Sequence, residues 1–304
     1  MKLFSILKGV LLAFSVIASP GLAAVQVVTT TSDLAAIVTA IGGDSVKVKS
    51  LTPGASDPHF AEAKPSMIRV TTDADLLVLV GADLEIGWLQ PLLQTARNGK
   101  ILPGSPGYLD MSAFVPLLDR ASGPVSRALG DVHPLGNPHY WLNPGNGLLI
   151  ARAIAERLKQ IDPGNASRYD ANLTVFVQEL QRRIPQWEAA LASLKGQPVI
   201  SYHTSLRYLA DAFGFQIVGQ IEPKPGIPPS ASHLENLIQV VRGQNVRLLL
   251  MEPFYERRSA AYLSQQTGIQ VVIIPQSVGA ERGIRSYFEL FDAIVQAIQK
   301  SATS

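Results

Sequence analysis

The 304-residue chain contains no cysteine and only five histidines. The absence of cysteine excludes disulfides, thiolate metal sites, cysteine nucleophiles and a lipid-anchored cysteine. The chain also has no large excess of one charge. Two of its 26 basic residues and none of its 24 acidic residues lie in residues 1–24, so the rest of the chain has equal numbers of basic and acidic residues. A nucleic-acid-binding protein would show a basic stripe, so this class is not expected. Because cysteine is absent, we expect any metal site to use nitrogen or oxygen ligands.

Long apolar runs are also missing outside the N-terminus. There, "MKLFSILKGVLLAFSVIASPGLAA" combines two lysines, an apolar run from Val10 to Ala18, a proline and small residues. This layout predicts a secretory signal peptide over residues 1–24, cleaved after Ala23 or Ala24. An uncleaved anchor is the alternative, although the apolar run falls short of the ~20 residues that span a membrane. We expect a soluble periplasmic protein with no lipid anchor.

Strand-like and helix-like segments alternate in the first part of the remaining chain. Apolar, β-branched or alternating runs predict strands at 24–31, 45–51 and 73–81. Between them, a helix is expected from an N-cap at Ser32 to the glycines at 42–43, and a second helix over 64–71. Strands that alternate with helices in this way indicate a parallel sheet built from βαβ units.

The C-terminal part repeats this pattern, and a long helix separates the two parts. Residues 165–196 show uninterrupted helical periodicity with one proline, Pro185, which we expect to kink the helix rather than end it. The chain is therefore predicted to be α/β, with two parallel-sheet lobes joined by a long rigid linker helix. The predicted strands of the second lobe are 197–202, 215–221, 246–252 and 269–275, and its helices are 204–214, 230–244, 257–268 and 282–300. The predicted division is a signal peptide 1–24, a first lobe 25–163, a linker helix 164–196 and a second lobe 197–304.

Three of the five histidines follow strands or lie on a stiff loop. His59 comes after the strand 45–51 and a Pro-Gly turn, and His203 falls at the carboxyl end of the strand 197–202. His139 lies in "GNPHYWLNPG", where the prolines restrict the backbone on both sides. Ligands of open parallel sheets bind at the carboxyl ends of the strands, so the three imidazoles can point into one cleft.

Three neutral imidazoles are enough for a tetrahedral zinc site with one further ligand. The alternative is that each histidine only packs in the core or caps a helix, and the spacings of 80 and 64 residues match no local metal motif. His133 and His233 are expected to be ordinary histidines rather than ligands. Tyr140 and Trp141 are expected to pack around the site. Asp57, two residues before His59, could fix the tautomer of that imidazole.

Five segments, in order over nearly the whole chain, resemble the zinc- and manganese-specific solute-binding proteins of bacterial ABC importers. They are "SDPHFAEAKPS", "NPHYWLNP", "VISYHTSLRYLADAFGF", "EPKPGIPPSASHLENLI" and "LLLMEPFYERRSAAYLSQQTGIQVV". The resemblance implies two lobes joined by a long helix with the metal between them. Carried over by position, the ligands are His59, His139 and His203. A histidine in the third position goes with zinc in that family, and a glutamate goes with manganese, so His203 indicates zinc.

Two features depart from the family pattern. The family usually supplies an aspartate after the last strand, whereas this chain reads "IIPQSVG" and places Gln276 or Ser277 there. The fourth ligand is therefore open between water, Gln276, Ser277 and Glu252, although Glu252 could equally be a hydrogen-bonded carboxylate at a strand end. Zinc members often carry a histidine-rich run before the second ligand, and here only His133 is present, which leaves its part in metal capture open.

The sequence predicts a monomeric periplasmic protein that captures Zn²⁺ and delivers it to an ABC permease in the inner membrane. Two alternatives remain at this point. A three-histidine site with an open position also describes a zinc hydrolase or hydratase, although no general base accompanies the histidines. A binding protein for manganese or copper is the other alternative.

Overall fold

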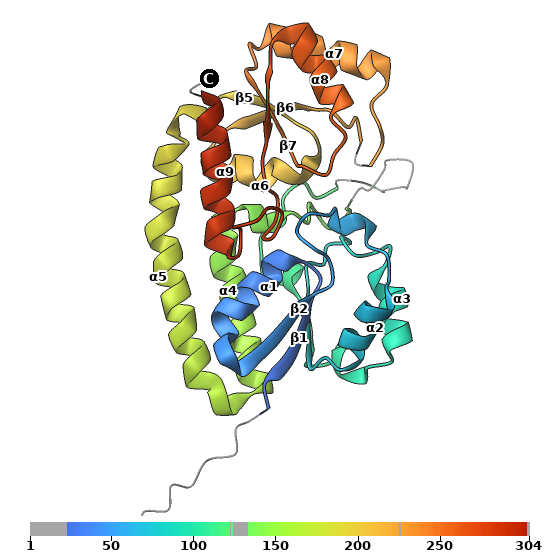
Figure 1. Ribbon diagram of the computed structural model, residues 1–304, viewed down its shortest axis with the longest axis vertical. Coiled ribbons are helices and arrows are strands. Elements are labelled where there is room, and N and C mark those ends of the chain that lie inside the picture. The colour runs from blue at the N-terminus through green and yellow to red at the C-terminus, as the bar shows by residue number, and fades with distance from the viewer. Residues whose placement is uncertain (1–22, 122, 124–132, 225, 303–304) are drawn as a thin grey trace, which may run out of the picture.

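The computed structural model describes residues 23–121, 123, 133–224 and 226–302, and it has two α/β lobes joined by a long helix (Figure 1). Most of the predicted signal peptide lies outside these residues. The first lobe contains a parallel sheet in the order β2-β1-β3-β4. Its strands are β1 (Val25–Thr29), β2 (Val46–Ser50), β3 (Leu76–Leu79) and β4 (Tyr108–Asp110). Every residue of β3 is buried, as expected for a central strand covered on both faces.

Three helices lie between these strands along the chain, and a fourth, longer helix follows β4. They are α1 (Ser32–Gly42), α2 (Pro65–Thr72), α3 (Leu89–Ala96) and α4 (Pro144–Ile161). The predicted N-cap of α1 is wrong by one residue, because the side chain of Thr31 rather than Ser32 accepts the bond from the Leu34 amide, at 3.5 Å. Thr31 has extended backbone angles, which a capping residue requires and the first helical residue cannot have.

The second lobe repeats the design with the strand order β6-β5-β7-β8, again all parallel. The strands are β5 (Pro198–Ser201), β6 (Gln216–Gln220), β7 (Leu248–Met251) and β8 (Gln270–Ile273). The helices between them are α6 (Arg207–Phe213), α7 (Ala231–Gly243) and α8 (Arg258–Thr267). Each predicted strand and helix of this lobe is present, with ends that differ by a few residues.

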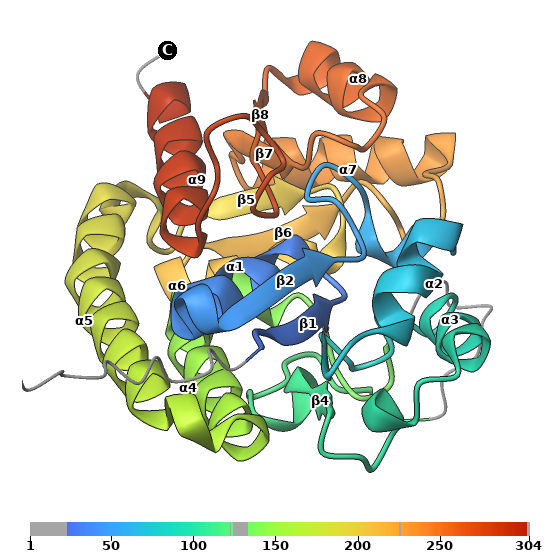
Figure 2. The ribbon, with the colours of Figure 1, turned by 60° about the horizontal axis from the view of Figure 1, so that its bottom comes forward.

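The linker helix α5 (Ala166–Ala190) runs along one side of both lobes (Figures 1 and 2). It continues through Pro185, as predicted, but it is shorter than the predicted 164–196 and gives way to a 3₁₀ turn, Ala192–Leu194. The helix packs against α1, α4 and the C-terminal helix α9 (Tyr287–Ala302). The last helix of the predicted second lobe therefore lies against the linker helix and also contacts α1 of the first lobe.

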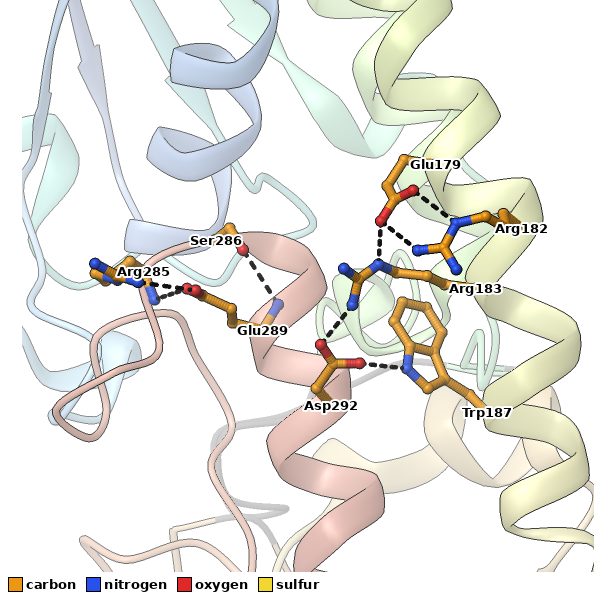
Figure 3. Close-up of polar contacts among 8 residues, drawn as sticks. All are labelled: Glu179, Arg182, Arg183, Trp187, Arg285, Ser286, Glu289 and Asp292. Atoms are coloured by element: carbon orange, nitrogen blue, oxygen red, sulfur yellow. Dashed lines mark hydrogen bonds and ion pairs between the residues drawn. The ribbon is translucent and has the colours of Figure 1, made fainter.

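Polar contacts fasten α5 to α9, and we call this contact the α5–α9 seam (Figure 3). Asp292 on α9 accepts from the guanidinium of Arg183 and, at 2.8 Å, from the indole Nε1 of Trp187. Glu179 pairs with the same Arg183 and with Arg182. These groups lie at or near the surface, above an apolar contact in which the Trp187 ring stacks on Phe291 with centroids 5.0 Å apart. The seam thus combines exposed ion pairs with a buried aromatic contact.

The two lobes also touch directly through the segment that follows β8. The Val278 amide donates to the buried carboxylate of Asp33 on α1, at 2.9 Å. A Cβ at Gly54, in the loop after β2, would lie 2.0 Å from the carbonyl oxygen of Val278. The Trp141 indole donates to the carbonyl of Gln276 at 3.0 Å. The lobes are therefore held at close contact beside the cleft by three separate segments of the first lobe.

Among the described helices, none combines the length and apolar character that crossing a membrane requires.

Candidate metal centre

His59 lies in a 3₁₀ turn, Pro58–Phe60, after β2. Asp57 caps this turn by accepting from the His59 amide at 2.9 Å, and the same carboxylate oxygen lies 2.7 Å from His59 Nδ1. Burial acts to raise the pKa of Asp57, but the hydrogen bonds from His59 outweigh it and hold that pKa below its usual value. An ionised carboxylate only accepts hydrogen bonds, so Nδ1 carries the proton and Nε2 presents a lone pair. The predicted role of Asp57 agrees with this geometry.

His139 is fully buried and immediately precedes a 3₁₀ turn, Tyr140–Leu142, at the start of α4. Asn137 repeats the arrangement seen at Asp57, since its side-chain oxygen accepts from the His139 amide at 3.0 Å and lies 2.9 Å from Nδ1. The ring nitrogen Nε2 is buried without a hydrogen-bond partner. Burial lowers the pKa of His139 well below its usual value, and the neighbouring histidines act in the same direction. This imidazole is neutral, with its lone pair aimed into the cleft.

His203 follows β5 and is 4% exposed. Its Nδ1 lies 2.7 Å from a carboxylate oxygen of Glu222, which follows the neighbouring strand β6. The Thr204 hydroxyl lies 3.3 Å from Nε2, and because a hydroxyl rotates freely it leaves that lone pair available. Glu222 is a neighbour of the candidate ligand His203 that the sequence reasoning missed. The available signal was its place at the carboxyl end of the predicted strand 215–221, beside that of His203.

The structure brings the three predicted ligands together. One ring nitrogen of each of His59, His139 and His203 lies within 4.8 Å of the others. In each ring the Nδ1 nitrogen is engaged by an oxygen acceptor, so the Nε2 lone pairs converge. Carboxylates or amides that fix a ligand's tautomer in this way are typical neighbours of metal-binding histidines. The arrangement fits a metal ion, and the two carboxylates behind it balance a double positive charge.

His133, expected to be an ordinary histidine, lies against one ring of the site. Its Nε2 lies 3.2 Å from Nε2 of His59, and the two rings are 5.3 Å apart between centroids. Burial, and then the nearby His59 and His203, lower the pKa of His133 to about 3, so this imidazole is neutral as well. His233 instead lies on α7 and bonds through Nε2 to the Gln220 carbonyl at 2.9 Å, as an ordinary histidine does.

The residues named for the fourth position are all buried near the cleft. Glu252, at the end of β7, accepts from the Ser205 hydroxyl through one oxygen, while its other oxygen has no partner. Burial raises the pKa of Glu252 to about 7, with the Ser205 bond acting against it. Gln276 and Ser277 are 3% and 6% exposed. Among the described His, Asp and Glu residues, the group whose possible ligand atoms lie within 4.8 Å of one another does not include Glu252.

Tyr140 and Trp141 pack beside the site, as predicted. Both are at most 1% exposed, and the rings of Trp141 and His139 are 5.3 Å apart. The Tyr140 hydroxyl donates to the Val80 carbonyl at 2.7 Å. Their hydrogen bonds are thus directed at backbone groups, and the two side chains hold the loop that carries His139.

Two lobes joined by one long helix, with convergent imidazoles between them, define a bilobal metal-binding protein. The chain belongs to the ZnuA family, the periplasmic component A of the zinc-uptake complex, whose model matches residues 27–301. This is a family of solute-binding components of metal ABC transporters, so the resemblance seen in the sequence is confirmed and the hydrolase or hydratase alternative is excluded. The protein is an extracytoplasmic, metal-binding solute-binding protein that works with an ABC transporter.

Relatives with curated functions agree on the class and differ in the metal. The chain is 27% identical over 270 residues to the metal ABC transporter substrate-binding lipoprotein ScbA of Streptococcus cristatus, covering 86% of this chain and 83% of the relative. It is 26% identical over 288 residues to the manganese ABC transporter substrate-binding lipoprotein PsaA of Streptococcus mitis, covering 90% and 89%. A crystal structure of ZnuA matches with a TM-score of 0.75 at 26% identity, covering 91% of this chain and 99% of that one.

Proposed function

We propose that this protein captures Zn²⁺ in the periplasm, between its two lobes, and delivers it as a monomer to a permease in the inner membrane. The ligands we propose are His59, His139 and His203. The observation that carries the proposal is the donor set, which in the described residues consists of imidazole nitrogens without a carboxylate. Imidazole suits zinc and copper, whereas manganese prefers carboxylate oxygens.

The surroundings of the site support an ion rather than an organic solute. A cavity of ≈ 20 Å³ adjoins the site and is lined in part by His59, His203, Glu222 and Tyr255. That volume holds about one water molecule. Asp57 and Glu222 together carry two negative charges that compensate a divalent cation without contacting it. The protein therefore offers a divalent ion imidazole ligands, and the carboxylates on the far side of two of these rings compensate the charge of the ion.

The location rests on the predicted signal peptide and on the absence of cysteine. The curated relatives are lipoproteins by name, whereas this sequence contains no cysteine to which a lipid could be attached. Cleavage after Ala23 or Ala24 would release a chain that begins at β1. N-terminal sequencing of the protein from a periplasmic extract tests this point, and an intact N-terminus in the membrane fraction would contradict it.

Metal analysis of protein purified without a histidine tag tests the metal. We expect one zinc per chain, and in competition titrations we expect manganese at a large excess to leave zinc bound. Displacement of zinc by comparable manganese would assign the protein to the manganese-binding group, and displacement by comparable copper under reducing and oxidising conditions would assign it to copper.

A further inference from the structure

Asn137, two residues before His139, is 5% exposed and uses both ends of its side-chain amide. Its Oδ1 accepts from the His139 amide at 3.0 Å and lies 2.9 Å from Nδ1 of the same histidine. Its Nδ2 donates to the Thr204 carbonyl at 2.9 Å. Thr204 directly follows His203, so one amide group contacts the segments that carry two of the three proposed ligands.

The partners of this amide determine which end is the oxygen. A backbone amide only donates and a backbone carbonyl only accepts, so the oxygen lies beside His139 and the nitrogen beside Thr204. An aspartate could hold the ring of His139 as well, in the way that Asp57 holds the ring of His59. An ionised aspartate could not donate to Thr204, however, and its second oxygen would face that carbonyl. The contact with the second lobe therefore requires an amide rather than a carboxylate.

The backbone of Asn137 is held from both lobes, independently of its side chain. The Tyr208 hydroxyl, on α6 of the second lobe, donates to the Asn137 carbonyl at 2.8 Å. The same hydroxyl accepts from the Leu118 amide at 2.8 Å, and the Leu118 carbonyl accepts from the Asn137 amide at 2.8 Å. A substitution of the Asn137 side chain therefore changes the contacts of the amide group and leaves these backbone bonds in place.

We propose that Asn137 is a positioning residue that sets the placement of His139 relative to His203 across the cleft. This inference rests on the proposed function, because it takes both histidines as ligands of one ion. The centroids of the two rings are 5.4 Å apart, and the amide of Asn137 connects the backbone segments behind them. A ring that is held in place rebinds an ion that has briefly left it, so this link slows the release of the metal.

Asn137→Asp tests the link, because it keeps the acceptor for His139 and removes the donor to Thr204. Asn98→Asp is the matched control. The Asn98 side chain has the same two-sided pattern, since its Oδ1 accepts from the Lys100 amide and its Nδ2 donates to two backbone carbonyls. These contacts lie within the first lobe and include no residue of the metal centre. Both substitutions thus remove the same kind of hydrogen bond, and only one of them removes it beside the proposed ligands.

Three measurements should separate the two variants. In the metal-free proteins, we expect backbone hydrogen exchange over residues 203–208 to be faster in Asn137→Asp than in the wild type, and unchanged in Asn98→Asp. Zinc release to a chelator, followed by stopped flow, should be at least about 10-fold faster in Asn137→Asp, the lower end of the effect of losing a group that supports a ligand. The visible spectrum of the Co²⁺-loaded protein should change in Asn137→Asp alone.

The sign of the change in release distinguishes the link from an effect of charge. A negative charge behind His139 attracts the cation, so the added charge of Asn137→Asp would by itself slow zinc release. Slower or unchanged release would therefore overturn the proposal, and so would an equal acceleration in Asn98→Asp. If Asn137→Asp does not fold, Asn137→Ala and Asn98→Ala replace the pair, with the same expected contrast. A wild type that binds no zinc would instead contradict the proposed function, whatever the hydrogen exchange shows.

Discussion

The metal centre and the α5–α9 seam are two polar clusters that join distant parts of the chain, and they do so in opposite ways. In the centre, three imidazoles converge at partly or fully buried positions, and each carboxylate behind them contacts one ring. In the seam, ionised groups lie at the surface, where water and salt weaken their attraction. The centre is therefore arranged for a ligand that is not part of the chain, whereas the seam is satisfied by the chain itself. Substitutions in the centre should change metal binding, and substitutions in the seam should change stability.

The largest expected effect is on metal binding in His139→Ala. Removal of a fully buried ligand should lower zinc affinity by several orders of magnitude, while His233→Ala should leave it unchanged. The melting temperature should show the same contrast, because a ligand that binds only the folded state raises it and the variant loses that increment. Isothermal titration and thermal melts with and without zinc measure both quantities. An equal loss of affinity in His233→Ala would contradict the assignment of the ligands.

The next largest effect concerns the groups that hold the ligands. Glu222→Gln keeps the shape of the side chain but removes the negative charge behind His203, and such changes typically cost about 10- to 100-fold in metal affinity. Asp57→Asn should have a similar effect through His59. Circular dichroism of the metal-free variants provides the folding control. If both variants bound zinc as tightly as the wild type, the carboxylates would have no part in charge compensation.

A smaller effect depends on pH and concerns the contact between the lobes. Burial raises the pKa of Asp33 to about 7, against the hydrogen bond from Val278. An unfolded aspartate titrates near ~3.9. Between these two pH values the folded protein keeps a proton on Asp33 that the unfolded chain has released. Rising pH therefore favours unfolding, and the stability that protonated Asp33 contributes is lost as the pH approaches 7.

Asp33→Asn removes this titration, so the comparison isolates it. From pH 4 to 7 we expect the wild type to lose stability relative to the variant, by up to about 1.4 kcal/mol per pH unit. Chemical denaturation of the metal-free proteins across this range measures the difference. A difference that stays constant with pH would show that Asp33 is ionised in the folded protein.

The smallest effect is expected in the seam. Asp292→Asn retains an oxygen that can accept from Trp187 and loses only the exposed ion pair with Arg183, which is worth about 0–1 kcal/mol. Asp292→Ala also leaves the Trp187 indole without an acceptor and should cost about 1–3 kcal/mol. Neither variant should change zinc affinity under conditions in which both variants are fully folded. A large loss of affinity in Asp292→Asn would show that the seam and the centre are coupled.

The sequence predicted all four strands of the second sheet and three of the first, but not the way the lobes are joined. Buried strands such as residues 76–79 are continuous apolar runs, which local patterns reveal. The contact of α9 with α5 and α1 depends on where the chain returns after the second sheet, and no local pattern encodes that. The helix 89–96 and the strand 108–110 were not predicted, for a related reason. They are short, and their character comes from the packing around them.

The site shows the same limit. The positions of His59 and His203 at strand ends, and the stiffness of the loop around His139, indicated that the three imidazoles could converge, and the resemblance to the solute-binding family singled them out as ligands. Glu222 was missed because it is 19 residues from His203 in sequence and adjacent only through the pairing of β5 with β6. The contact between His133 and His59 was not predicted because the two residues are 74 positions apart in sequence.

The close approach of Gly54 to Val278 has a consequence for how this chain can vary. Every amino acid other than glycine has a Cβ, and here that atom would lie 2.0 Å from a backbone oxygen, which cannot move aside as a side chain can. Each missense change of the glycine codon therefore introduces the same collision, regardless of the polarity or size of the new residue. No single substitution at position 54 is therefore expected to be tolerated without a shift of the backbone. In a library of all twenty amino acids at this position, glycine alone should preserve the native contact between the lobes.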